Sequence, residues 1–147
     1  MSDVISVITP VQIGIWNIPG RGQNFINNHY ASLKNIKITT LNANGLFYNN
    51  SKLLRAVVKN GKNPDVEIIF CSILQLQNYE KADLGDFIDF FKDYRVHFAL
   101  ELIDGVGKRF LENSLSELKD ISKNDIINLM EIDRYQDYFH KYKNNII

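Results

Sequence analysis

The chain has 147 residues, with 17 Lys+Arg against 17 Asp+Glu, a length that suits one domain with a real hydrophobic core. A net charge of zero argues against a dedicated nucleic-acid binder, whose phosphate contacts need clustered Lys and Arg. One cysteine, Cys71, excludes a disulfide framework and a multi-cysteine metal site. No apolar run approaches the roughly 20 residues of a membrane span, and no export signal is visible, so we expect a cytoplasmic protein.

The charge is distributed unevenly along the chain. Residues 1–74 carry seven basic and three acidic side chains, whereas residues 75–147 carry ten basic and fourteen acidic ones. The first half therefore offers a mild attraction for anions, and the second half is typical of solvated acidic helices. Ordinary variation in surface charge is an equally simple explanation.

Short apolar runs alternate with helical patterns over the first 105 residues. Residues 1–10 could add an edge strand that Pro10 ends. The other strands are expected at residues 11–16, 36–41, 66–74 and 96–102. Apolar residues at helical spacing predict helices near residues 22–33, 51–61 and 83–94.

This alternation, with connections long enough for parallel crossovers, predicts an α/β fold. We expect a single four- or five-stranded, mostly parallel sheet flanked by helices in residues 1–105. Residues 106–147 are expected to form a helical C-terminal extension that packs on this domain or on a partner subunit. Its aromatic residues recur at helical spacing, which suits core packing or a homodimer contact: Tyr135, Tyr138, Phe139 and Tyr142.

In an open parallel sheet, ligands bind outside the carboxyl ends of the strands. The loop at residues 17–24 leads into the first expected helix, and its glycines, helix N-terminus and arginine together could bind an anion. We expect Gly20, Arg21 and Gly22 to hold the anion, and Gln23 and Asn24 to bind hydroxyl groups. The spacing matches no nucleotide-binding fingerprint, and a tight turn with a surface arginine is the alternative.

The later strand ends carry further candidates. Asn42 and Tyr48 could bind sugar hydroxyls, although asparagine-rich loops also simply form turns. Ser72 and Gln75 follow the third strand, with Ser72 a candidate nucleophile that lacks the GxSxG setting. Glu101 closes the fourth strand, where it could act as a general base, pair with Arg21, or be a solvated edge residue.

The histidines share no metal-ligand spacing with each other or with Cys71, so we expect no metal site and no cofactor. We interpret His29, His97 and His140 as structural or surface residues. Cys71 lies in the most apolar run and is expected to be an inert core thiol.

Three strings resemble a small bacterial family, the sporadic carbohydrate cluster proteins: IPGRGQN at residues 18–24 followed by Tyr30, IFCSILQL at residues 69–76, and HFALE at residues 97–101. The family's genes lie among those for capsule, O-antigen or other surface-polysaccharide synthesis. The resemblance covers roughly residues 13–103, and it implies a sugar pathway rather than a particular reaction.

The chain departs from the family pattern in its first loop, which is shorter, and at Gly22, where the family has valine. It also has Thr40-Leu41-Asn42 where the family has a Thr-Glu pair, which implies an altered activity if that glutamate is catalytic. At the level of pattern, the alternating elements also resemble the resolvase-like domain of serine recombinases and flavodoxin-like folds. Residues 16–19 lack the recombinase serine, so this second resemblance concerns the fold alone.

Two functions follow as hypotheses. In the first, the protein belongs to surface-carbohydrate biosynthesis and binds an anionic sugar or nucleotide-sugar at the strand ends, with Glu101 as acid/base. In the second, it is a non-catalytic interaction or regulatory module that uses the aromatic C-terminal helix. The sequence leaves open whether the protein is an enzyme.

Overall fold

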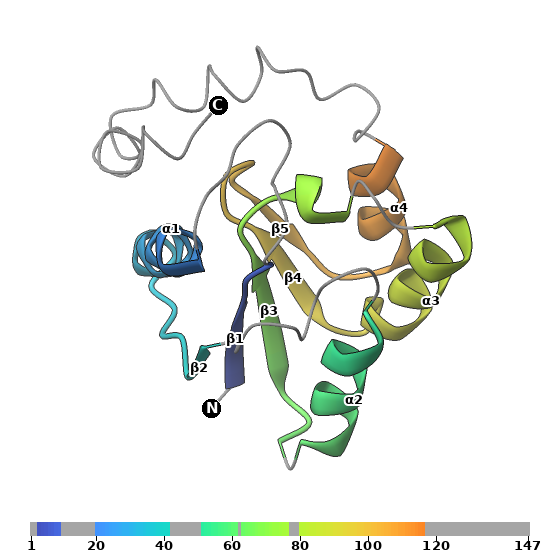
Figure 1. Cartoon of the computed structure of the whole chain (residues 1–147), viewed down its shortest axis with the longest axis horizontal. Coiled ribbons are helices and arrows are strands. Elements are labelled where there is room, and N and C mark those ends of the chain that lie inside the picture. Colours follow the sequence, from blue (N-terminus) through green and yellow to red (C-terminus); the bar gives the residue numbers. More distant parts are fainter. Residues whose placement is uncertain (1–2, 10–19, 42–50, 62, 77–79, 117–147) are drawn as a thin grey trace.

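The computed structural model describes residues 3–9, 20–41, 51–61, 63–76 and 80–116 (Figure 1). Its five strands form one sheet in the order β2-β1-β3-β4-β5. They are β1 (Asp3–Val7), β2 (Thr40–Leu41), β3 (Val66–Phe70), β4 (Arg95–Phe98) and β5 (Ile103–Gly105). All neighbouring pairs are parallel except β4 and β5, which are antiparallel. The expected mostly parallel α/β sheet is therefore confirmed.

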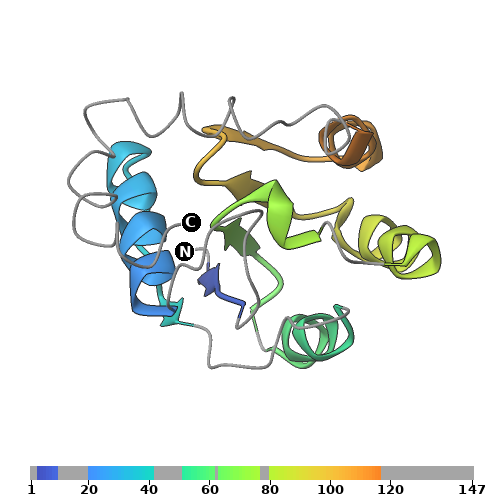
Figure 2. The same cartoon turned by 45° about the horizontal axis from the view of Figure 1, so that its top comes forward.

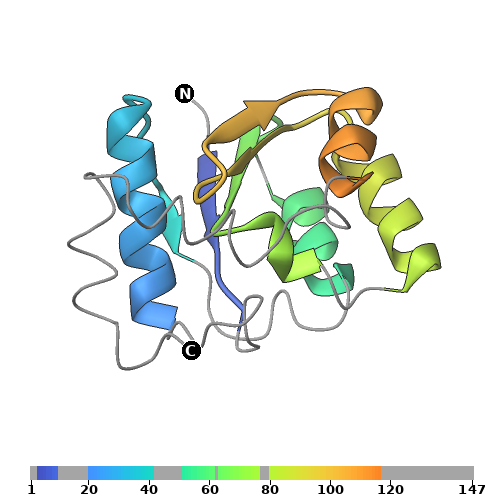
Figure 3. The ribbon, with the colours of Figure 1, turned by 90° about the horizontal axis from the view of Figure 1, so that it is seen from above.

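Helices cover both faces of this sheet. They are α1 (Gly20–Leu33), α2 (Lys52–Asn60), α3 (Lys81–Phe91) and α4 (Lys108–Ser116), and a short 3-10 turn, η1 (Ile73–Leu76), follows β3. Figures 2 and 3 show α1 on one side of the sheet and α2, α3 and α4 on the other. Right-handed crossovers explain this division, because the chain moves from β1 to β2 in one direction and from β2 back to β3 in the other.

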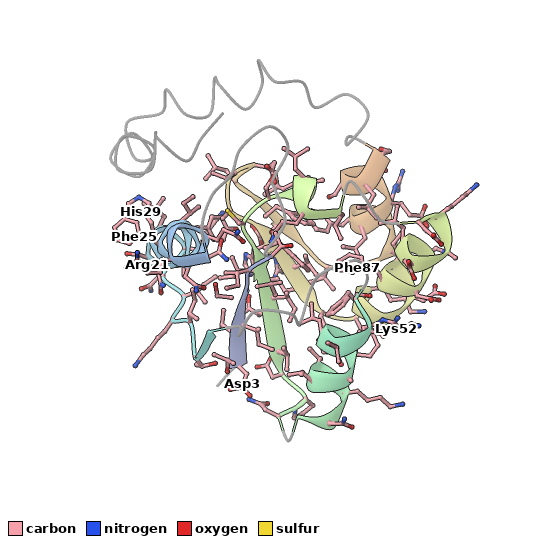
Figure 4. All side chains as sticks on the ribbon, viewed as in Figure 1. Asp3, Arg21, Phe25, His29, Lys52 and Phe87 are labelled. Atoms are coloured by element: carbon pink, nitrogen blue, oxygen red, sulfur yellow. The ribbon has the colours of Figure 1, made fainter. Side chains whose placement is uncertain are left out.

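The larger core lies between the sheet and the three helices α2, α3 and α4. Alternate residues of the strands point into it, as the period of a strand requires. Phe87 of α3, labelled in Figure 4, packs there against Phe70, with the two ring centroids 5.7 Å apart, and against Phe91 of the same helix. The other fully enclosed members come from β1, β3 and β4, from η1, and from α2 and α4: Val7, Leu54, Ile68, Ile73, Leu76, Val96, Phe98 and Leu111.

The face under α1 is more polar. Ile26 and Tyr30 of α1 are buried there, but so are Ser6 of β1, Asn27 of α1 and His97 of β4. Buried polar groups need hydrogen-bond partners, so this face depends on specific polar contacts in addition to apolar packing.

Several predicted boundaries are corrected by the structure. The strand in residues 1–10 is not at the edge, since β1 lies between β2 and β3. It is apolar at consecutive positions, as a strand covered on both faces requires. The strand expected at 36–41 is reduced to β2, the one at 66–74 ends at Phe70, and the one at 96–102 ends at Phe98.

Other predicted elements are confirmed, and two predictions concern residues that the structure does not describe. Helices expected at residues 22–33, 51–61 and 83–94 correspond to α1, α2 and α3. The expected extension begins with α4, whose Leu111 belongs to the larger core. The predicted strand at 11–16 and the aromatic stripe at 135–142 lie outside the described residues. None of the helices in the described part of the chain is long and apolar enough to cross a membrane.

Candidate functional site

Glu101 lies in the turn that joins β4 to β5, beside the end of β3. The backbone N–H groups of Ala99 and Leu100 donate to the carbonyl oxygens of Phe70 and Cys71, each at 2.9 Å. Leu102 then adopts a φ of 61°, a left-handed conformation that branched residues rarely take. The turn is thus tied to β3 on one side and bent sharply on the other, which fixes the position of Glu101 between them.

The Glu101 carboxyl group binds the start of η1. Its Oε1 accepts a hydrogen bond from the Ile73 backbone N–H at 2.6 Å, and its Oε2 accepts one from the Ser72 hydroxyl at 2.8 Å. The Ser72 Oγ in turn accepts from the Leu74 backbone N–H at 3.1 Å. A carboxylate at the N-terminal end of a helical turn is favourably placed, because the N–H groups there lack helical partners.

The pKa of Glu101 is raised from 4.5 to about 7. Burial is the largest cause, because it disfavours the charged form, and the hydrogen bonds from Ile73 and Ser72 lower the pKa only in part. The carboxyl group is therefore close to half protonated at neutral pH. A group with this pKa is suited to accept or donate a proton during a reaction.

The same environment affects Cys71. Burial raises the pKa of its thiol well above the ordinary value, and the charge of Glu101 raises it further. Since the thiolate is the reactive form, this thiol is poorly reactive at neutral pH. The structure thus agrees with the expectation of an inert core cysteine.

Polar side chains of α1 bind the carboxyl-terminal part of β1. The Ser6 hydroxyl donates to Asn24 Oδ1 at 2.8 Å and accepts from Asn27 Nδ2 at 2.9 Å. Gln23 is fully buried, and its amide exchanges two 2.8 Å hydrogen bonds with the backbone N–H and C=O of Thr9. Gln23 and Asn24, expected to bind sugar hydroxyls, therefore bind the protein itself in this structure.

A second set of hydrogen-bonded side chains links α1 to β3 and β4 in the middle of the sheet. The Tyr30 hydroxyl lies 2.9 Å from His97 Nδ1, and His97 Nε2 lies 2.8 Å from Glu67 Oε1. His97 is 1% exposed, so both ring nitrogens have protein partners inside the fold. This bonding pattern agrees with the expected structural role of His97.

The expected anion-binding residues belong to a different element from Glu101. Gly20, Arg21 and Gly22 form the first turn of α1, and Figure 4 shows Arg21, Phe25 and His29 on the side of α1 that faces away from the sheet. Arg21 is exposed. The two oxygens of Glu101 bind Ser72 and Ile73, and the ion pairs of the described residues do not include the suggested pairing of Glu101 with Arg21. Asn42 and Tyr48 lie outside the described residues, as does His140.

The structure therefore brings together Ser72, Gln75 and Glu101, since the Ser72 backbone N–H also donates to Gln75 Oε1 at 3.1 Å. Sequence reasoning missed Ser6, Thr9 and Asn27. A signal for Asn27 was present, because it lies four positions after Gln23 and three before Tyr30, on the helical face that turns toward the sheet.

Two surface hollows lie elsewhere. One, of about 430 Å³, is lined by Leu102, Ile103, Asp104, Phe110, Asn113 and Ser114. The other, of about 440 Å³, lies between α3 and α4 and includes Leu84, Ile88 and Leu115. Neither hollow is lined by Ser72 or Glu101, so the hydrogen-bonded carboxyl group of the candidate site lies outside both of them.

Among the described residues, no group of three or more His, Cys, Asp or Glu side chains could hold a metal ion. Comparisons of the chain with protein-family models, with curated proteins and with solved structures gave no match. The candidate site is therefore defined by its geometry alone: a carboxyl group of raised pKa bonded to Ser72 at the carboxyl ends of β3 and β4.

Proposed function

We propose that this protein binds a sugar or nucleotide-sugar of bacterial surface-carbohydrate biosynthesis at the carboxyl ends of β3 and β4, and that Glu101 is its acid/base. The observation that carries the proposal is the Glu101 carboxyl group, with a pKa of about 7 and a 2.8 Å hydrogen bond to Ser72. The fold supports only the choice of edge, because open parallel sheets bind ligands outside the carboxyl ends of their strands. The strand order reverses between β1 and β3, so β3 borders both that point and the Glu101 site.

The chemistry of the site favours the hydroxyl groups of such a ligand. The unprotonated carboxylate accepts a hydrogen bond from a sugar hydroxyl and can take its proton, and the protonated form can return one. Ser72 positions the carboxyl group through its own hydroxyl. Because a carboxylate repels an anion, the phosphate of a nucleotide-sugar has to lie away from Glu101, and the start of α1 is the expected place.

The carbohydrate assignment comes from the resemblance of three strings to the sporadic carbohydrate cluster proteins, and residues of these strings contact one another. Ser72 of the second string bonds Glu101 of the third, and Tyr30, which follows the first, bonds His97 of the third. Only the first of these two pairs belongs to the proposed site, since the contact between Tyr30 and His97 is structural.

A thermal-shift screen tests the proposal, using hexoses, hexose 1-phosphates and UDP-hexoses as probes. Specific binding at a hundredfold excess over Kd stabilises the native protein by about 2.7 kcal/mol. We expect a shift with at least one probe, and its loss in Glu101→Gln. Loss in Arg21→Ala as well indicates an anion at the start of α1, whereas an unchanged shift restricts the site to Glu101. No shift with any probe contradicts the proposal and favours a non-catalytic interaction module.

A further inference from the structure

The side-chain amide of Gln75 is buried, but only its oxygen makes a hydrogen bond within the described part of the chain. Gln75 lies in η1 between the buried residues Leu74 and Leu76 and is itself 2% exposed. Its Oε1 accepts a hydrogen bond from the Ser72 backbone N–H at 3.1 Å. Among the residues that the structure describes, its Nε2 has no hydrogen-bond partner.

The orientation of this amide follows from its one hydrogen bond. Only the oxygen of the amide can accept from an N–H group, so the NH₂ group cannot occupy that position. The unpaired atom is therefore a donor. Buried donors without partners destabilise a fold, and native proteins contain few of them outside functional sites.

Gln75 and Glu101 flank the same residue. The backbone N–H of Ser72 binds the Gln75 amide, while its hydroxyl binds the Glu101 carboxyl group. The residue with the unused donor and the residue that accepts protons are therefore both bonded to Ser72, just after the end of β3. A compound with two neighbouring hydroxyl groups matches this pair, because one hydroxyl donates to the carboxylate and the other accepts from the amide.

We propose that Gln75 is a ligand-recognising residue of the Glu101 site, and that the ligand carries a vicinal diol, one oxygen of which accepts a hydrogen bond from Gln75 Nε2. This inference rests on the proposed function and adds to it the substrate class and the residue that selects it. A deoxygenated analogue leaves the buried amide unpaired, which is the situation in which a site discriminates most strongly between related ligands.

Binding of UDP-glucose, UDP-galactose and glucose 1-phosphate to the wild-type protein, Gln75→Met and Glu101→Gln tests the inference. Methionine keeps the approximate volume of the side chain but has no amide. We expect Gln75→Met to weaken binding of the active probe about tenfold, the effect of one lost hydrogen bond. A deoxy analogue lacking the recognised hydroxyl should bind wild type and Gln75→Met with similar affinity.

A second readout needs no variant to fold. The side-chain NH₂ resonances of Gln75 in a ¹⁵N-labelled wild-type protein should move when the active probe is added. Unmoved resonances, or full affinity in Gln75→Met with binding still lost in Glu101→Gln, overturn the inference but leave the proposed function standing. Either of these two results would indicate that the Gln75 amide donates its hydrogen bond to a buried water instead of a ligand. No binding by any probe overturns the proposed function and this inference with it.

Discussion

The carboxyl group of Glu101 is subject to two opposing influences at the end of β4. Burial favours its protonated form, while the hydrogen bonds from Ile73 and Ser72 favour its charged form. Burial has the greater effect, and the pKa rises to about 7. A solvent-exposed carboxylate that accepted the same hydrogen bonds would be expected to keep an ordinary or lowered pKa, so burial is what makes the Glu101 carboxyl group suited to proton transfer near neutral pH.

This pKa predicts how stability depends on pH. The folded-state pKa of Glu101 lies above the ordinary value of 4.5 for this side chain, so its contribution to stability is fully present below pH 4.5 and is lost as the pH rises through about 7. From the size of the shift, the loss amounts to about 3 kcal/mol at most. Chemical denaturation between pH 4.5 and 8 should show this decline in the wild-type protein and a flatter profile in Glu101→Gln.

Asp104 provides a contrast within the same experiment. Burial acts to raise its pKa, but the hydrogen bond from Arg95 and the charges of His97, Lys34 and Arg95 outweigh burial and lower it. Its contribution is therefore present above its unfolded-state pKa of 3.8 and is lost only as the pH falls below that range. A profile that declines equally in wild type and Glu101→Gln would contradict the assignment to Glu101.

The link between α1 and the sheet leads to another prediction. Tyr30→Phe removes the hydroxyl that bonds His97 Nδ1 and leaves that buried nitrogen without its partner. We expect a loss of about 1–3 kcal/mol in the free energy of unfolding. The control is Phe25→Leu, which changes a ring that is 44% exposed on the outer side of α1. Equal losses in the two variants would show that the hydrogen bond contributes little.

At the level of elements, helices with a regular apolar pattern could be predicted from the sequence, and the shortest strand could not. Apolar residues at helical spacing located α2 between Ser51 and Gly61, although the Ser51 hydroxyl accepts from Arg55 rather than capping the backbone. β5 has only three residues, too few to show alternation. The central position of β1 depends on pairing with β2 and β3, and local sequence carries no information on such pairing.

The candidate site shows the same limit. The rule that ligands bind at strand ends singled out Ser72, Gln75 and Glu101, and the structure brings these three together. Their hydrogen bonds join residues 29 positions apart and were not predictable from sequence. Gln23 and Asn24 lie in the first helix, as expected, but their side chains bond Thr9 and Ser6 instead of remaining available to a ligand. The reason is that the face of α1 that they occupy turns toward the sheet.

The packing of α4 on β5 gives a prediction with a matched control. A Cβ added at Gly105 would lie 2.5 Å from Cδ1 of the Phe110 ring, whereas one added at Gly85 of α3 would meet nothing within 4 Å. Gly105→Ala should lower the free energy of unfolding by about 1–3 kcal/mol through overpacking. Gly85→Ala should raise it by about 0.5–1 kcal/mol, as expected in an exposed helix interior. Stabilisation by both changes would contradict the described packing of Phe110.

Across the whole molecule, the two faces of the sheet are stabilised differently. The face under α2, α3 and α4 is an aromatic and aliphatic core that extends from Ile5 to Leu111. The face under α1 depends on amide, hydroxyl and imidazole groups that bond to one another and to the backbone. The candidate site lies beside the larger core, since Ile73 and Leu76 of η1 belong to that core and Ile73 donates to Glu101.

The position of the larger core predicts the effect of truncation. All of its buried members lie between residues 5 and 111, so a chain that ends at residue 121 should keep a cooperative unfolding transition. Sedimentation of the full-length and truncated chains distinguishes a homodimer contact from core packing as the role of the aromatic stripe at residues 135–142. A dimer lost on truncation supports the interaction module. Complete unfolding of the shorter chain would contradict the view that residues 3–116 contain a sufficient core.

An NMR titration of the Glu101 side-chain carboxyl carbon, assigned by its absence in Glu101→Gln, tests the role of Glu101 most directly. We expect a titration midpoint near 7, and a higher midpoint in Ser72→Ala, because the Ser72 hydroxyl lowers this pKa. A midpoint near 4.5, unaffected by Ser72→Ala, would make Glu101 an ordinary carboxylate and remove the basis for its proposed role as the acid/base of a sugar site.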